Sequence, residues 1–110
     1  MKNLFISVPM SGFSDEQIDI MVNKLYSIAA EHFGDRLRII PTIIEEEMSP
    51  IGYLARSIEL MDSADYFIGV DMTGSISFYR GCAIENMVAE YYGIPYILVN
   101  INVLLCLFMG

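Results

Sequence analysis

Four short apolar segments, separated by longer amphipathic ones, constrain the fold of this chain more than any other feature. They lie at about residues 4–8, 38–42, 66–70 and 96–99. The first, LFISV, is apolar except for Ser7, as is typical of a strand that is buried on both faces of a parallel sheet. The second contains Pro41, which lacks a backbone N–H and therefore favours an edge position.

The segments between these strands carry helix signals. Ser14 and Gln17 form a capping-box pattern before an amphipathic stretch at about residues 15–32. Gly34 follows as the stop signal, because glycine readily adopts the left-handed conformation that ends many helices. The pair Ser49-Pro50 indicates an N-cap that is followed by proline at the first helical position. These patterns predict two helices, and the segment after residue 80 predicts a third.

Strands that alternate with helices predict an α/β fold, with a parallel sheet, right-handed crossovers and a helix layer on each face. For a small open sheet we expect the strand order 2-1-3-4 and a single domain over residues 1–110. The apolar spacing also predicts which residues of the second and third helices are buried. They are Ile51, Leu54, Ala55, Ile58 and Met61 in the second helix, and Ile84, Met87, Val88 and Tyr91 in the third.

The last ten residues, INVLLCLFMG, carry no charge and are strongly apolar. A fifth strand, or a segment that is buried against another subunit, would account for this composition. The pattern does not decide between strand and helix. An exposed tail of this kind would aggregate, so we expect it to be covered.

Charge and cysteine usage exclude several classes of function. The net charge is −8, from 14 acidic and 6 basic residues, which argues against nucleic acid as a partner. Cys82, Cys106 and the single His32 do not form a zinc-binding spacing, so we expect no metal and no cofactor. No apolar run approaches the roughly 18 residues of a membrane span. We expect a cytoplasmic protein with reduced thiols and no membrane partner.

The predicted strand order places a ligand site where the order reverses, between the first and third strands. Two loops meet there, 9–13 and 71–81. This topology brings together a set of small, polar and charged residues, which are Ser11, Gly12, Asp71, Arg80 and Glu85. Asp65 lies at the opposite end of the third strand and is expected to be structural. The Glu45–Glu47 run is expected to be a solvated surface.

Glu85 is the candidate catalytic residue. We expect it in the first turn of the third helix, outside the core, where the helix dipole would keep a carboxylate ionised unless burial outweighs it. An ionised carboxylate is the state that a carboxylate nucleophile needs. The loops lack a dinucleotide-binding glycine pattern, a P-loop and a serine elbow. A carboxylate that works without metal or histidine is typical of glycosidic-bond chemistry.

Three segments in order, FISVPMSG, YLARSIELMDSADYFIGV and RGCAIENMVAEYYGIPYILV, resemble the nucleoside 2-deoxyribosyltransferase-like superfamily, and in particular a small branch of bacterial and phage proteins. The resemblance runs from about Met1 to Val99 and leaves the tail uncovered. It implies a Rossmann-like, or flavodoxin-like, sheet of four to five strands, with the tail as the potential fifth. It also implies a homo-oligomer, a dimer or larger, in which a neighbour helps to close each site.

The resemblance assigns roles to residues of the predicted site. It implies that Glu85 attacks the anomeric carbon of a 2-deoxynucleoside, and that the turn Pro9-Met10-Ser11-Gly12 receives base or sugar. Arg80 agrees with the small branch and could hold a 5′-phosphate at the helix start. With Asp71 and Gly81, these residues form the predicted substrate site. The chain departs from the superfamily at four positions, which are Phe5 in place of Tyr, Val8 in place of Gly, and Ser57 and Tyr79 each in place of Asp.

Three hypotheses follow. The first is a nucleoside or nucleotide N-glycosidase or 2-deoxyribosyltransferase with Glu85 as nucleophile. The second is a catalytically impaired nucleotide-binding or sensor module, which the missing Tyr and the two missing Asp residues favour. The third is an assembly protein whose pocket is vestigial.

Overall fold

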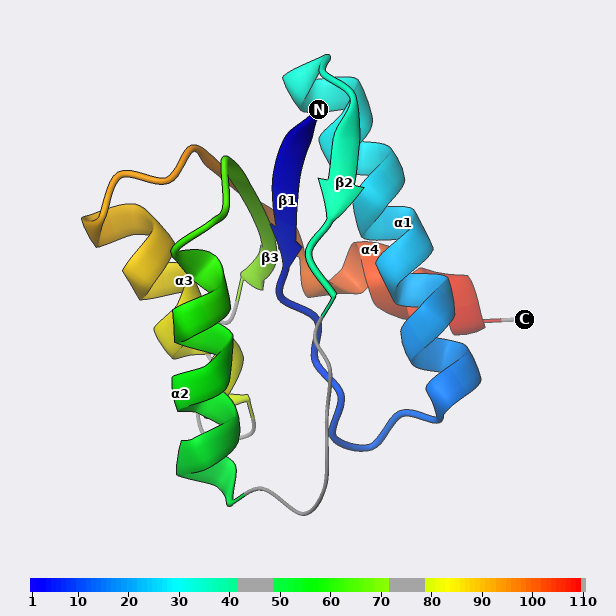
Figure 1. Ribbon diagram of the computed structural model, residues 1–110. Helices are drawn as coiled ribbons and strands as arrows, with labels where there is room; N and C mark the ends of the chain where they lie inside the picture. The colour runs from blue at the N-terminus through cyan, green and yellow to red at the C-terminus, as the bar shows by residue number, and fades with distance from the viewer. Residues whose placement is uncertain (42–48, 72–78, 110) are drawn as a thin grey trace.

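Four parallel strands form the centre of the molecule in the computed structural model, which describes residues 1–41, 49–71 and 79–109 (Figure 1). The strands are β1 (Lys2–Ile6), β2 (Leu37–Ile39), β3 (Tyr66–Asp71) and β4 (Tyr96–Asn100). Their order is β2-β1-β3-β4, and each adjacent pair is parallel. The predicted strand order and the edge position of the second strand are therefore confirmed.

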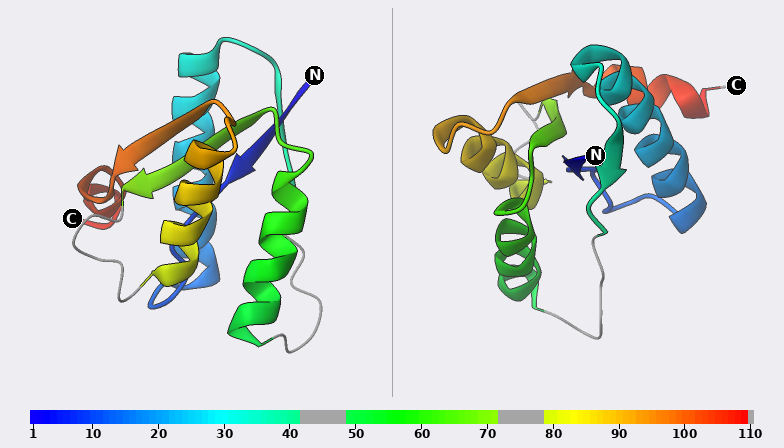
Figure 2. Two further views of the ribbon diagram at one scale, coloured as in Figure 1. Left: turned by 90° about the vertical axis from the view of Figure 1, so that its left-hand side faces the viewer. Right: turned by 45° about the horizontal axis from the view of Figure 1, so that its top comes forward.

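Helices cover both faces of this sheet (Figures 1 and 2). The helix α1 (Asp15–Phe33) lies on one face with the C-terminal α4 (Ile101–Leu105) and the short 3-10 helix η1 (Cys106–Phe108). The helices α2 (Pro50–Met61) and α3 (Arg80–Tyr91) lie on the other face. The fold is thus the expected three-layer, Rossmann-like α/β arrangement. Across the described ranges, every helix falls short of the length and apolar character needed to cross a membrane.

The predicted caps begin and end the helices. The backbone N–H of Gln17 donates to Ser14 Oγ at 3.1 Å, and Ser14 N–H donates to Gln17 Oε1 at 2.9 Å, which completes the capping box of α1. Gly34 ends α1 at a φ of 69°. Ser49 caps α2 by accepting from the N–H of Gly52 at 3.0 Å.

The apolar tail is helical, and this settles the alternative that the sequence left open. Asn100 caps α4 by accepting from the N–H of Asn102 at 2.9 Å. Leu104 is fully buried, and the ring centroid of Phe108 lies 6.0 Å from that of Phe13, just before α1. Within the described residues, the sheet therefore ends at β4.

Alternate residues of β1 enter different cores. Leu4 and Ile6 face the core under α1, where they join Met21, Leu25 and Ala29. Phe5 faces the other side, and its ring stacks on Phe67 with centroids 5.7 Å apart. Because side chains alternate along an extended chain, Ser7 shares the face of Phe5. A single strand thus contributes side chains to both cores, one on each face of the sheet.

The predicted buried stripes of α2 and α3 are partly wrong. In α2, Ile51 and Ala55 are exposed and Met61 is buried. In α3, the side chains of Ile84, Met87 and Tyr91 are exposed. The buried residues of α3 are instead Cys82, Ala83, Glu85, Asn86 and Ala89. The helix is rotated relative to its apolar stripe because its polar residues find partners at the sheet, as described next.

Candidate functional site

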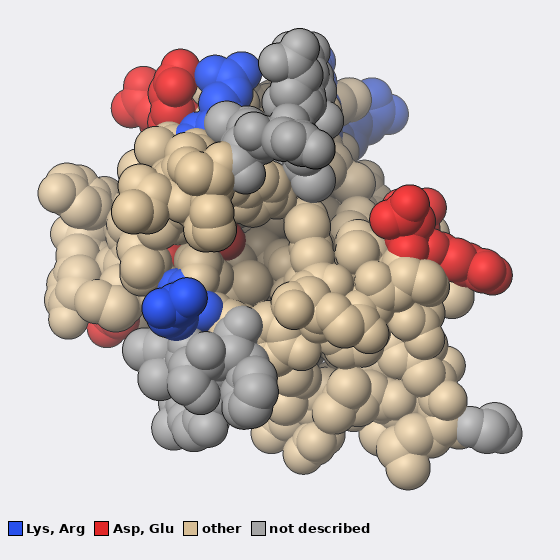
Figure 3. Space-filling model, turned by 90° about the horizontal axis from the view of Figure 1, so that it is seen from below, with Lys and Arg blue, Asp and Glu red and all other residues tan. Residues whose placement is uncertain are grey.

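A cavity of about 680 Å³ opens beyond the carboxyl end of β1. Its walls are residues 5–8 and Met10, several residues between 49 and 57 in and before α2, and most residues between 79 and 85 at the start of α3. This volume is in the range of small-molecule sites. Figure 3 views the molecule from this side and shows the hollow, bordered mostly by uncharged side chains.

Glu85 lines this cavity from a buried position. Its side chain is 7% exposed, and Ser7, which is 2% exposed, donates from Oγ to Glu85 Oε1 at 2.7 Å. Two expectations for Glu85 were wrong. It is a buried residue, and it is the sixth residue of α3, beyond the first turn. The reason is that α3 begins at Arg80, which places Glu85 in the second turn of the helix, next to the end of β1.

Burial changes the ionisation of Glu85. Loss of solvation raises the pKa of Glu85, while hydrogen bonds from Ser7 and Ser57 lower it and only partly offset that effect. The helix dipole acts mainly within the first turn, so it does not hold this carboxylate ionised in the way expected from the sequence.

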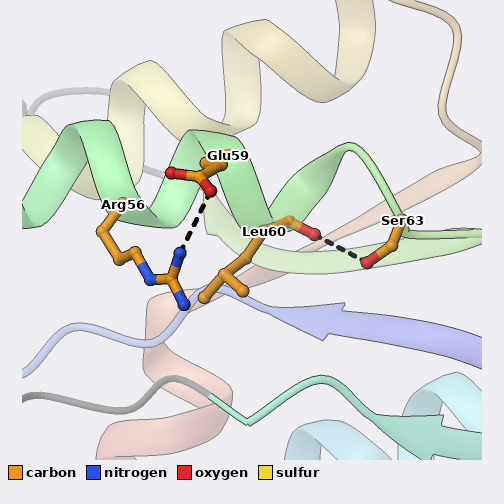
Figure 4. Close-up of polar contacts among 4 residues, drawn as sticks. All are labelled: Arg56, Glu59, Leu60 and Ser63. Carbon is orange, nitrogen blue, oxygen red and sulfur yellow. Dashed lines mark hydrogen bonds and ion pairs between the residues drawn. The ribbon is translucent and has the colours of Figure 1, made fainter.

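Arg56, the neighbour of Ser57, pairs with Glu59 at 3.1 Å on the surface of α2 (Figure 4).

Two further titratable side chains line the cavity beside Glu85. Burial raises the pKa of the Cys82 thiol to about 11, so that Cys82 is a neutral thiol at physiological pH. Burial, followed by the nearby Glu85 carboxylate, raises the pKa of Tyr53. The Tyr53 hydroxyl is 3.5 Å from Met10 Sδ, a weak hydrogen bond. The floor of the cavity therefore carries hydroxyl and thiol donors around one carboxyl group.

The structure places the predicted site residues in two groups. Met10, Arg80, Gly81 and Glu85 line the cavity. Pro9, Ser11, Gly12 and Asp71 lie outside the lining. Pro9 is fully buried, whereas Ser11, Gly12 and Asp71 are exposed.

The two predicted loops do approach each other. The Tyr79 hydroxyl donates to the backbone carbonyl of Ser11 at 3.3 Å, which ties the start of α3 to the turn after β1. Residues 72–78 of the second loop, like Glu45–Glu47, lie outside the described residues. Asp65 accepts from the backbone N–H of Asn3 at 2.7 Å, which fits the structural role expected at the amino ends of the strands.

Sequence reasoning missed the hydroxyl partners of Glu85. Ser7 was visible as the polar residue within the apolar first strand, on the same face as Phe5. Ser57 and Tyr53 lie on α2, and their residue types alone gave no signal of a site. Phe5 itself packs on Phe67 and provides no hydroxyl group. The hydroxyl that reaches Glu85 comes from Ser7, the residue directly after β1.

A close approach between α3 and β3 fixes where Glu85 lies. The Asn86 Nδ2 group donates to the carbonyl of Val70 at 2.7 Å, while its buried Oδ1 has no hydrogen-bond partner among the described residues. A Cβ atom at Gly69 would lie 2.4 Å from Asn86 Oδ1 and 2.8 Å from the ring of Phe67. Glycine is thus required at position 69 for α3 to sit this close to the sheet.

Comparisons with family models, with curated proteins and with solved structures found no match to this chain. The described residues contain no cluster of three or more His, Cys, Asp or Glu side chains that could hold a metal ion.

Proposed function

We propose that this chain is a nucleoside or nucleotide N-glycosidase or 2-deoxyribosyltransferase in which Glu85 is the nucleophile. One observation carries the proposal. A buried carboxyl group, oriented by a 2.7 Å hydrogen bond from Ser7, lines a cavity large enough for a nucleoside at the carboxyl ends of the strands. The ordered segments that resemble the 2-deoxyribosyltransferase-like superfamily add to it.

The chemistry needs an anion beside a sugar carbon that becomes positively charged. The Glu85 carboxylate attacks the anomeric carbon, the glycosidic C–N bond breaks, and its electron pair leaves with the base, which takes up a proton. Water, or a second base, then attacks the same carbon and releases Glu85 as a carboxylate. Ser7 and Ser57 act as positioning residues, because their hydroxyl groups hold the carboxylate without entering the reaction.

The rest of the lining fits a base and a phosphate. Met10, Tyr53 and Ile84 give the cavity an apolar wall for a flat base. Arg80 lies exposed where the cavity meets the first turn of α3, and Tyr79 provides no side-chain cap for that turn. An arginine beside helix N–H groups that the N-cap side chain does not bind favours an anion, so a 5′-monophosphate is the preferred form of the substrate.

A second function, nucleotide binding without turnover, is favoured by the raised pKa of Glu85. A protonated carboxyl group is a poor nucleophile but a good hydrogen-bond donor to a ligand. The two functions differ in one measurable respect, because only the enzyme releases free base.

The direct test is incubation with 2-deoxynucleosides and their 5′-monophosphates while free base is followed by chromatography. We expect release that falls by at least ~10³-fold in Glu85→Ala. Release that persists in this variant would remove Glu85 from the mechanism. Binding by calorimetry, without release over a long incubation, would establish the second function instead.

A milder variant separates positioning from chemistry. Ser7→Ala removes the hydrogen bond that favours ionised Glu85, so the pKa of Glu85 rises further and the rate profile moves to higher pH. At neutral pH we expect a loss of about 10-fold, with recovery at higher pH. Ser27→Ala, which alters an exposed hydroxyl of α1, is the control and should leave the profile unchanged. A loss that is equal at every pH would contradict the positioning role.

A further inference from the structure

The last fifth of the chain has a surface unlike the rest. All 20 charged residues precede residue 91, so residues 91–110 are uncharged. Of the 14 large hydrophobic side chains that are exposed in the described residues, 8 belong to this part of the chain. They are Tyr91, Tyr92, Tyr96, Leu98, Val103, Leu105, Leu107 and Met109. In Figure 3, the surface at the lower right, beside the C-terminal end, shows only uncharged side chains.

The strand β4 lies within this region and has an open edge. It pairs with β3 on one side, and the described part of the sheet ends there (Figure 2). Its sequence, YILVN, has no charge, no proline and no glycine. Edge strands normally carry a lysine, a proline or a bulge that blocks further pairing. With none of these, the N–H and C=O groups along β4 are a template for another strand.

The side chains beside this edge are also uncovered. Tyr96 and Leu98 are 41% and 39% exposed on one side of β4. On the other side, α4 and η1 present Val103, Leu105 and Leu107. An apolar surface therefore flanks the open strand on both faces, as it would at the middle of a continuous sheet.

The distribution of charge indicates which kind of partner binds this surface. A lipid surface is disfavoured, because interfacial helices use basic residues and this region has none. Two copies of a chain with net charge −8 repel each other wherever their charged faces meet. The repulsion is smallest where they meet through uncharged surface, and a two-fold axis brings the same patch of each copy together.

We propose that two copies of this chain associate through β4, which pairs antiparallel with β4 of the second copy to form one continuous sheet across the interface. In a symmetric pair centred on the five-residue strand, Leu98 lies opposite Leu98 of the second copy. The α4 helices then cover one face of the junction, and Tyr96 of each copy contributes to the other. This interface does not depend on the proposed reaction.

Light scattering coupled to size-exclusion chromatography tests the association. We expect twice the chain mass of 12.4 kDa, with dimerisation that strengthens as salt screens the net charge. Leu98→Lys should weaken the dimer by at least ~100-fold in Kd, since it buries a charge at the junction. The matched control is Ile20→Lys on α1, an equally exposed apolar side chain at 40%, which should leave the dimer intact.

A cross-link tests the geometry even if the lysine variant folds poorly. In a Cys106→Ala background, Leu98→Cys should form an intermolecular disulfide on mild oxidation, because opposed strand residues lie within disulfide reach. Ile20→Cys in the same background should not. A monomeric wild-type chain would overturn the proposal. A dimer that survives Leu98→Lys and does not cross-link at position 98, or one that is lost in Met87→Lys alone, would overturn it equally.

Discussion

The two faces of the sheet differ, because one packs into an apolar core and the other borders a cavity with a buried carboxyl group. On the α1 face, Leu4 and Ile6 pack with Met21 and Leu25 in a core of buried apolar side chains. On the α2 and α3 face, Phe5 packs on Phe67, but Ser7 meets the carboxyl group of Glu85. The first face stabilises the fold through burial. The second gives up part of that stabilisation to keep a carboxyl group in a cavity, which is the usual pattern of a functional site.

The largest expected difference between the faces concerns stability. Leu25→Ala empties a fully buried position of the α1 core and should cost about 2–5 kcal/mol in the free energy of unfolding. Ile51→Ala, on the cavity side of the molecule, changes a side chain that is 81% exposed and should cost under ~0.5 kcal/mol. Urea denaturation followed by circular dichroism measures both. Equal costs would mean that the faces do not differ as the structure indicates.

A smaller effect is expected where the cavity side meets the sheet. Gly69→Ala places a methyl group against Asn86 and Phe67 and should cost about 1–3 kcal/mol, because α3 must move away from β3. In an Asn86→Ala background, the cost should decrease, since the nearest clash is gone. The comparison is a double-mutant cycle by urea denaturation. Additive costs would show that Asn86 is not what makes glycine necessary at this position.

The smallest expected effect is a pH dependence that only the cavity side should show. The pKa of Glu85 is raised in the folded chain, so the folded state binds more protons than the unfolded state above the ordinary pKa of glutamate. Its contribution to stability is therefore complete at low pH and is lost as pH rises through the raised pKa. Glu85→Gln should be less sensitive to pH across this interval and should melt a few degrees higher at neutral pH. Parallel melting curves against pH for both proteins would contradict the raised pKa.

Local signals in the sequence determined most of the fold. Ser14 and Gln17 set the start of α1, Gly34 set its end, and Pro50 set the start of α2. The alternation of strands and helices gave the strand order, because parallel strands need crossovers and the crossovers have one hand. The neutral tail was recognised as unusual, but its helical form depends on the Asn100 cap and on contacts of Leu104 that no local pattern specifies.

The candidate site was predicted only in part. The position of a carboxylate on α3 near the end of β1 followed from topology, and Met10, Arg80 and Gly81 line the cavity beside it. The sequence did not predict which face of α3 is buried, because the apolar stripe of this helix is exposed in the structure. Hydropathy assigns a polar residue to the surface, whereas a buried carboxyl or amide becomes acceptable once a partner such as Ser7 or Val70 lies within hydrogen-bond distance.

The sequence by itself determined the elements of this protein and their order, since periodicity, caps and crossover handedness act over a few residues or through simple rules of connection. Only the tertiary structure decided that Glu85 is buried, that Ser7 is its partner, and that β4 is an edge strand of the described sheet. These properties depend on atoms that are far apart in the chain, and the free energy of a buried polar group is set by its distant partners rather than by its neighbours in sequence.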